Sequence, residues 1–129
     1  MDFLKTLLAV LLMSWAACWA QAQGVSAKPL LRTPLSGDES KETLVLAIEF
    51  AQGATTGRHV HPGDEYAVVL EGTLELRLDG QALRRVTTGQ AYHNARGVIH
   101  ETVNVGDGLA RTVATFVVDK GKPVTVPAP

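Results

Sequence analysis

Cysteine and tryptophan are scarce in this chain, and both are confined to its beginning. The only cysteine is Cys18, and the two tryptophans, Trp15 and Trp19, lie on either side of it. The rest of the chain therefore has no thiol that could form a disulfide, ligate a metal or act as a nucleophile. Its stability must come from an ordinary hydrophobic core, for which a single domain of about 100 residues is sufficient.

An excess of charge of one sign is also absent. The sequence has 12 Lys and Arg residues against 13 Asp and Glu residues, which gives a net charge of −1. Proteins that bind nucleic acids or anionic membranes carry clusters of basic side chains. The charge balance therefore gives no support to a nucleic-acid or membrane partner.

No apolar run is long enough to cross a bilayer, which takes about 20 residues. The chain opens with one cation, Lys5, followed by an apolar stretch that reaches Ala20 and closes with the small residues Ala20 and Ala22. This pattern predicts a signal peptide over residues 1–22, cleaved before Gln23, and hence a periplasmic or secreted protein with no membrane contact after cleavage. The alternatives are a retained anchor helix and a lipoprotein modified at Cys18.

Helical periodicity is missing after residue 22, whereas strand alternation is frequent. Asp79-Gly80 is a strong hairpin signal between two such segments. The predicted strands are 43–50, 66–70, 73–78, 82–86, 99–103 and 111–118. We therefore expect one all-β domain over residues 43–118, preceded by an N-terminal arm over 23–42 with an edge strand near 29–31, and followed by a C-terminal tail over 119–129.

Two of these segments, 66–70 and 113–118, are apolar on both faces. A strand of this kind needs cover on both sides. One face would line the interior of the domain, and a partner subunit would cover the other. The sequence therefore predicts a homodimer, and the alternative is that the N-terminal arm covers this surface.

His59, His61 and Glu65 form half of a metal site. Residues i and i+2 of an extended chain point to the same side, so His59 and His61 present their imidazoles together. Pro62-Gly63 then turns the backbone, and Glu65 begins the next apolar segment. Two imidazoles and a carboxylate suit a divalent transition metal.

The surrounding residues resemble the two motifs of the cupin superfamily, in the small single-domain form (monocupin, cupin type 2) of exported bacterial proteins. The first motif is met by Gly53, His59, His61, Glu65 and Gly72, and the second by Gly89, Gly97, His100 and Asn104, with Ala95 where the motif has proline. The resemblance implies the cupin double-stranded β-helix, a jelly-roll barrel. It also implies His100 as the fourth ligand of one divalent ion, which could be Fe, Mn, Zn, Ni or Cu.

Four further residues are candidates for lining a ligand pocket. They are Tyr92, His93, Arg96 and Phe116. Tyr92 and Phe116 suit the core as well as a pocket, and His93 suits either the pocket mouth or the surface. Arg96 could hold a substrate carboxylate in bidentate fashion or be solvated. Asn94 stands where some related small cupins carry glutamate, so an acid/base role of that glutamate would be absent here.

The resemblance leaves three functions open. The first is a dioxygenase-type oxidoreductase that acts on a small organic molecule at a three-His/one-Glu site, because the sequence offers few proton-transfer residues and the metal would do the chemistry. The second is a non-catalytic periplasmic module that binds a metal or a small ligand. The third is a metal-dependent isomerase or lyase, which would need a proton carrier such as His93 or Tyr92.

Overall fold

The computed structural model describes residues 23–129, and in this part of the chain all regular structure is β-strand. The strands are β1 (Val25–Leu35), β2 (Asp38–Phe50), β3 (His59–Val60), β4 (Gly63–Glu71), β5 (Thr73–Leu78), β6 (Arg84–Thr87), β7 (Ala91–Asn94), β8 (His100–Asn104), β9 (Ala110–Asp119) and β10 (Val126–Pro127). The signal peptide predicted for residues 1–22 lies outside the described residues and stays a prediction. No helix within the described range is long and apolar enough to cross a membrane.

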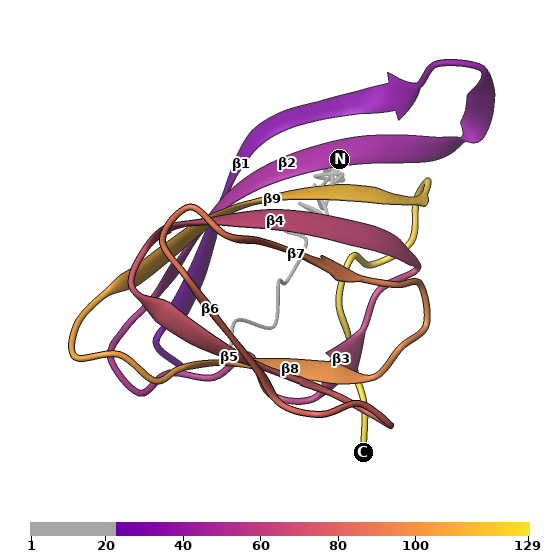
Figure 1. Cartoon of the computed structure of the whole chain (residues 1–129). Coiled ribbons are helices and arrows are strands. Elements are labelled where there is room, and N and C mark those ends of the chain that lie inside the picture. Colours follow the sequence, from indigo (N-terminus) through magenta and orange to yellow (C-terminus); the bar gives the residue numbers. More distant parts are fainter. Residues whose placement is uncertain (1–22) are drawn as a thin grey trace, which may run out of the picture.

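The strands form two antiparallel sheets of five strands each (Figure 1). We call them sheet A, with the order β1-β2-β9-β4-β7, and sheet B, with the order β10-β3-β8-β5-β6. Apart from the hairpins β1-β2 and β5-β6, neighbouring strands are not consecutive in the sequence, and the chain crosses repeatedly from one sheet to the other. This arrangement confirms the predicted all-β jelly roll.

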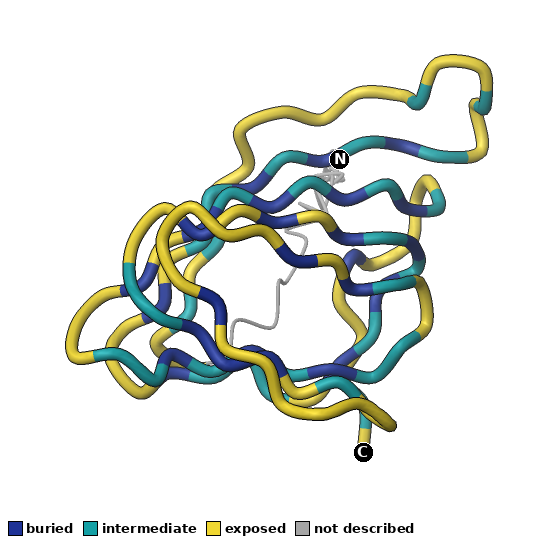
Figure 2. The backbone as a smooth tube through the Cα atoms, viewed as in Figure 1, coloured by how far each residue is buried: buried dark blue, intermediate teal, exposed yellow. Residues whose placement is uncertain are grey.

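The core fills the space between the two sheets, because alternate residues of each strand point inward. In Figure 2 the buried segments alternate with exposed ones along the strands that enclose the interior. The apolar core residues are Leu44, Leu46, Phe50, Ala67, Val69, Leu74, Leu76, Val86, Tyr92, Ala110, Ala114, Phe116, Val118 and Val124. The alternation of apolar residues in segments 43–50 and 73–78 therefore predicts correctly which side chains point into the core.

The N-terminal arm is a long hairpin and not a loop with a short edge strand. β1 runs over eleven residues and pairs with β2, which begins at Asp38, five residues before the predicted start. The turn is at Ser36-Gly37, where Gly37 has a positive φ of 87°. Sequence patterning missed the extent of β1 because eight of its eleven residues are exposed, so that backbone hydrogen bonds to β2 hold it more than apolar burial does.

Asp79-Gly80 forms a turn, but the two strands do not meet at it. The Gln81 backbone N–H donates to the Leu78 carbonyl at 3.1 Å, whereas the last cross-strand pair is Leu76 with Arg84. β6 therefore covers Arg84–Thr87 instead of the predicted 82–86. The loop residue Leu83 is 64% exposed, so no apolar burial extends the pairing to the turn.

The C-terminal tail belongs to the barrel. β10 pairs with β3 through Val126 with Val60 and Pro127 with His59. Val124 is 5% exposed and packs in the core. The three prolines after residue 121 led to the expectation that the fold ends before them, but β10 in the tail pairs with the strand that carries His59.

The outward faces of the two sheets differ in chemistry. On sheet A, Tyr66, Val68 and Leu70 of β4 are 43–50% exposed. On sheet B, the outward side chains form a polar network in which Arg77 and Arg85 both pair with Glu75. β1 lies at the edge of sheet A and pairs only with β2, so it does not cover the exposed face of β4.

Candidate metal centre

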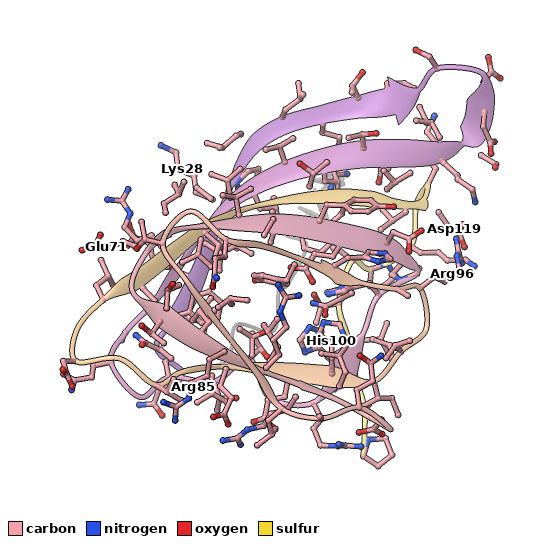
Figure 3. The ribbon with its side chains drawn as sticks, viewed as in Figure 1. Lys28, Glu71, Arg85, Arg96, His100 and Asp119 are labelled. Atoms are coloured by element: carbon pink, nitrogen blue, oxygen red, sulfur yellow. The ribbon has the colours of Figure 1, made fainter. Side chains whose placement is uncertain are left out.

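Three histidines meet inside the barrel although they come from two separate motifs. His59 lies on β3 directly opposite His100 on β8, and this pairing joins the two motifs. His61 comes directly after β3, and the ligand nitrogens of the three imidazoles all lie within 4.8 Å of one another. Figure 3 shows His100 pointing into the space between the sheets.

Glu65 reaches the same point from the opposite sheet. It lies on β4, on the inward face of sheet A. Its Oε2 is 3.1 Å from Nε2 of His61 and 3.6 Å from Nε2 of His100. The structure therefore brings together the four side chains that the two motifs single out.

Backbone carbonyls hold the three imidazoles in one tautomer. The Nδ1 atoms of His59, His61 and His100 lie 2.8, 2.6 and 2.9 Å from the carbonyl oxygens of Gly57, Val124 and Val98, respectively. A carbonyl oxygen only accepts hydrogen bonds, so each Nδ1 must carry the proton and donate it. A ring that is neutral therefore presents the lone pair of Nε2 to the interior.

The inward atoms of the cluster are thus all acceptors. The Nε2 atom of His100 is buried and has no hydrogen-bond partner, and Glu65 Oε2 faces Nε2 of His61 without an intervening donor. Lone pairs at this distance repel each other unless a cation lies between them. A single proton could bridge only one pair of these acceptor atoms. Three imidazoles and a carboxylate that converge on one point instead suit a divalent metal ion.

The electrostatics of the centre keep its ligands ready to bind. Burial lowers the pKa of His59 to about 4, so this ring is neutral over the physiological range. Burial by itself would raise the pKa of the Glu65 carboxyl, but hydrogen bonds to its oxygens, from His100 and His61 whenever their Nε2 atoms carry a proton and from Asn94 Nδ2, hold that pKa well below its ordinary range. The carboxylate is therefore charged and the imidazole uncharged, as metal binding requires.

This pKa shift predicts how the metal-free protein responds to acid. His59 is neutral when folded but takes up a proton near pH 6.5 when unfolded, so the unfolded state binds more protons below that pH. The stabilisation is complete above pH 6.5 and is lost as the pH falls towards about 4, with a total of roughly 3 kcal/mol. Urea unfolding at pH 7, 6, 5 and 4.5 measures the loss.

His59→Gln is the matched control for this experiment, because it keeps a polar side chain and removes the titration. The free energy of unfolding of this variant should change much less between pH 6.5 and 4.5. Glu65 adds a loss in the same direction only below its ordinary unfolded value of about 4.3. An equal slope for wild type and variant would contradict the role of His59.

The four predicted pocket residues divide into two inside the barrel and two outside. The Phe116 ring packs edge-on against His61 with centroids 4.9 Å apart, and Tyr92 is 5% exposed in the core. Burial, followed by the charge of Glu65, raises the pKa of the Tyr92 phenol, so Tyr92 stays protonated. Tyr92 and Phe116 therefore act as walls of the interior.

His93 and Arg96 point away from the interior, so the expectation that they line the pocket is corrected. His93 stacks on Tyr66 on the outward face of sheet A, and its Nε2 lies 2.9 Å from Asp64 Oδ1. Arg96 makes a bidentate ion pair with Asp119, and Figure 3 shows the two side chains together at the surface. Strand alternation could have placed His93 outside, since Tyr92 and Asn94 on either side of it point inward.

Two residues of the centre were missed or undervalued in the sequence. Val124 supplies the carbonyl for His61 from 63 residues away, and a backbone carbonyl leaves no signature in the sequence. Asn94 was noted only for the glutamate that it replaces, yet it is 1% exposed and its Nδ2 donates to Glu65 Oε2 at 2.8 Å. The alternation around Asn94 was available as a signal for its inward direction.

The second motif keeps its turn without the motif's proline. The Val98 N–H donates to the Ala95 carbonyl at 3.2 Å, and Gly97 adopts a positive φ of 72°. Asn104 has a structural role: its Nδ2 lies within 3.1 Å of the carbonyls of Phe50, Ala51 and Gly108. This asparagine therefore ties the end of β8 to neighbouring loops and does not take part in the metal centre.

Access to the centre from solvent is closed in this structure. The four candidate ligands are 1–5% exposed. Two hollows on the described surface share Gln23, Gly24 and Ala51, and none of the candidate ligands lines either of them. A ligand that reaches the centre must therefore displace side chains or part of a loop.

Comparison with known proteins agrees with the two motifs. Residues 46–118 match the model of the cupin domain. The chain is 31% identical over 94 residues to the HTH-type transcriptional regulator PuuR of Escherichia coli, which covers 72% of this chain and 48% of PuuR. It is 41% identical over 69 residues to the beta-alanine degradation protein BauB of Pseudomonas aeruginosa, which covers 51% of this chain and 72% of BauB. The chain thus spans about half the length of PuuR.

Solved structures share the fold at lower identity. A recombinant oxalate oxidase in complex with glycolate superposes with a TM-score of 0.65 at 23% identity, covering 84% of this chain and 57% of the oxidase. The polyketide cyclase RemF from Streptomyces resistomycificus also gives a TM-score of 0.65 at 23% identity, covering 84% of this chain and 75% of RemF. Because the cupin model matches more than half of the chain, from β2 to β9, and both motifs are present, this protein belongs to the cupin superfamily.

Proposed function

We propose that His59, His61, Glu65 and His100 bind one divalent transition metal and that the protein is a dioxygenase-type oxidoreductase for a small organic molecule. The observation that carries the metal site is the convergence of three imidazole Nε2 atoms and the Glu65 carboxylate, with the Nδ1–H of each imidazole bonded to a backbone carbonyl. Four protein ligands leave coordination positions open for exchangeable ligands. A bound redox-active ion would supply the electron transfer that amino-acid side chains do not supply.

The chain's own residues support this chemistry by what they exclude. Phe116 packs against His61 and shields the centre from water, and Tyr92 stays neutral and is unsuited to act as a base. His93 lies outside the barrel. The proton carriers that an isomerase or lyase would use were His93 and Tyr92, so the structure weakens that alternative.

The second alternative, a non-catalytic binding module, draws support from two observations. The four candidate ligands are almost inaccessible to solvent, which suits a site that retains its ion. PuuR, a relative by sequence, is a transcriptional regulator and not an enzyme by its name. The names of two structural neighbours, an oxalate oxidase and a polyketide cyclase, are evidence of the same kind in favour of catalysis.

Metal exchange distinguishes the three functions. Metal-free protein is loaded with Fe²⁺ or Zn²⁺ and supplied with small carboxylic acids and phenols, while O₂ consumption and product formation are followed. Under the proposed function, iron supports O₂ uptake at least about 100-fold above zinc, because zinc has no redox chemistry. Equal turnover with both metals would favour the isomerase or lyase, and tight metal retention without turnover would favour the binding module.

We further propose that a second copy of the chain covers the outward face of sheet A. One cross-strand row of this face contains Leu31, Val45, Thr115 and Tyr66. The next outward row contains Val68. Five strands of this length present a face on the order of 600 Å², close to the ~800 Å² per partner of a standard interface. The charged outer face of sheet B suits water instead.

Val68→Lys is expected to convert the dimer into a monomer. The substitution places a charge in the middle of the apolar face, where burial against a second copy would desolvate it. Light scattering at micromolar concentration measures the mass. Leu83→Lys is the matched control, since Leu83 is more exposed but lies in the β5–β6 loop, and it should leave the dimer intact. A monomeric wild-type protein would contradict the proposed interface.

A further inference from the structure

Among residues 23–129, Asn94 is the buried amide side chain that hydrogen-bonds to a candidate ligand. It lies on β7 directly opposite Glu65 on β4, and both side chains are on the inward face of sheet A. Its Nδ2 donates to Glu65 Oε2 at 2.8 Å, the same oxygen that faces His61 and His100. The side chain is 1% exposed, and its other polar atom, Oδ1, is buried without any hydrogen-bond partner.

The orientation of this amide follows from the chemistry of its neighbour. A Glu65 carboxylate that ligates a metal is ionised and can only accept hydrogen bonds. The end of Asn94 that faces it must therefore be the NH₂ group, and a flipped amide would place oxygen against oxygen. Oδ1 is bonded to the same carbon, about 2.3 Å from Nδ2, so it lies within roughly 5 Å of Glu65 Oε2.

A buried acceptor without a partner is costly, by roughly 1–3 kcal/mol, so a free Oδ1 at this place calls for a donor. The neighbouring candidate ligands cannot provide one. Glu65 is a carboxylate, and the Nδ1–H groups of the histidines are used by backbone carbonyls. The donor must therefore come from a molecule bound at the metal centre.

We propose that Asn94 is a specificity-determining residue: Nδ2 positions Glu65, and Oδ1 accepts a hydrogen bond from a protonated oxygen of the molecule bound at the metal. This inference rests on the metal site of the proposed function. The class of ligand that it selects is small hydroxylated molecules, such as α-hydroxy acids, over analogues in which the same oxygen carries no proton. A metal-bound hydroxyl is a good donor, because the cation withdraws electron density from its oxygen.

The test compares two probes that differ in this proton. Glycolate and methoxyacetate both offer a carboxylate and one further oxygen to a metal, but only glycolate has a hydroxyl. The protein is loaded with Co²⁺, and each probe is titrated while the visible absorption of the cobalt is recorded, which requires no catalytic activity. The measured quantity is the ratio of the two dissociation constants, methoxyacetate over glycolate.

The variants are Asn94→Leu, which keeps the volume and removes both polar atoms, and Asn94→Ala, which also opens space. We expect the ratio to fall by about 2- to 12-fold in both variants, which corresponds to the net free energy of one hydrogen bond. Thr112→Val is the matched control. Thr112 Oγ1 is a second buried oxygen without a partner. It lies on β9 opposite Val69, four cross-strand pairs from Glu65, and its removal should leave the ratio unchanged.

Each outcome decides a different point. A ratio that is the same in wild type and both Asn94 variants, with cobalt bound in all, overturns the inference and leaves the metal site standing. A fall of the same size in Thr112→Val also overturns it, because the effect would then follow from any change in the interior. If wild-type protein takes up no cobalt, the proposed function fails and the inference fails with it.

Discussion

Replacement of His61 or His100 with alanine is expected to reduce bound metal from about one ion per chain to less than a tenth of that. Each change removes an Nε2 atom from a centre of four converging ligands. His61→Ala also leaves the Val124 carbonyl without its hydrogen bond, and Glu65 then loses its contact at 3.1 Å. Loss of one of four ligands lowers metal affinity by far more than loss of an outer hydrogen bond, which costs roughly 10- to 100-fold. Metal analysis of purified, dialysed protein measures the effect.

His93→Gln is the matched control, since it removes the remaining histidine of the sequence. His93 lies on the outward face and pairs with Asp64, so this variant should keep its metal. The barrel should remain folded without metal, because its apolar core does not depend on the ion. Circular dichroism therefore separates loss of metal from loss of fold. Wild-type metal content in both alanine variants would show that the ion binds elsewhere.

Gly63→Ala is expected to destabilise the protein by about 3 kcal/mol or more. A Cβ atom at Gly63 would lie 1.9 Å from the Val117 carbonyl oxygen and 2.7 Å from Cα of Val118. Both are backbone atoms of β9, so relief requires the two paired strands to separate. Overpacking typically costs 1–3 kcal/mol where side chains can adjust, and here they cannot. Because Gly63 lies between His61 and Glu65, the shift should weaken metal binding as well.

Gly108→Ala separates this steric effect from the general cost of replacing glycine. A Cβ at Gly108 would meet no atom within 4 Å, and its φ is not in the left-handed region. This variant should therefore remain within about 0.5 kcal/mol of wild type. Urea unfolding of the metal-free proteins gives both values. If Gly63→Ala unfolds at the same urea concentration as Gly108→Ala, the strands are more adaptable than the structure indicates.

The sequence by itself determined the fold class and the position of most strands. Alternation of apolar residues reports directly which side of a strand is buried, as in the segment from Leu44 to Phe50. The His59–His61 spacing placed two imidazoles on one side, because alternation in an extended chain is a local property. The motif resemblance added Glu65 and His100, and the structure brings these four side chains together. That they bind a metal stays a prediction.

Only the tertiary structure decided how the centre is held and closed. The Val124 carbonyl reaches His61 from the far end of the chain, and Asn94 meets Glu65 because β7 and β4 pair. The same pairing turns His93 outward, and Arg96 forms an ion pair with Asp119. These contacts depend on strand order and register, which arise from the packing of the two sheets. A backbone carbonyl or a cross-strand neighbour has no local signature in the sequence, so no local pattern could have identified them.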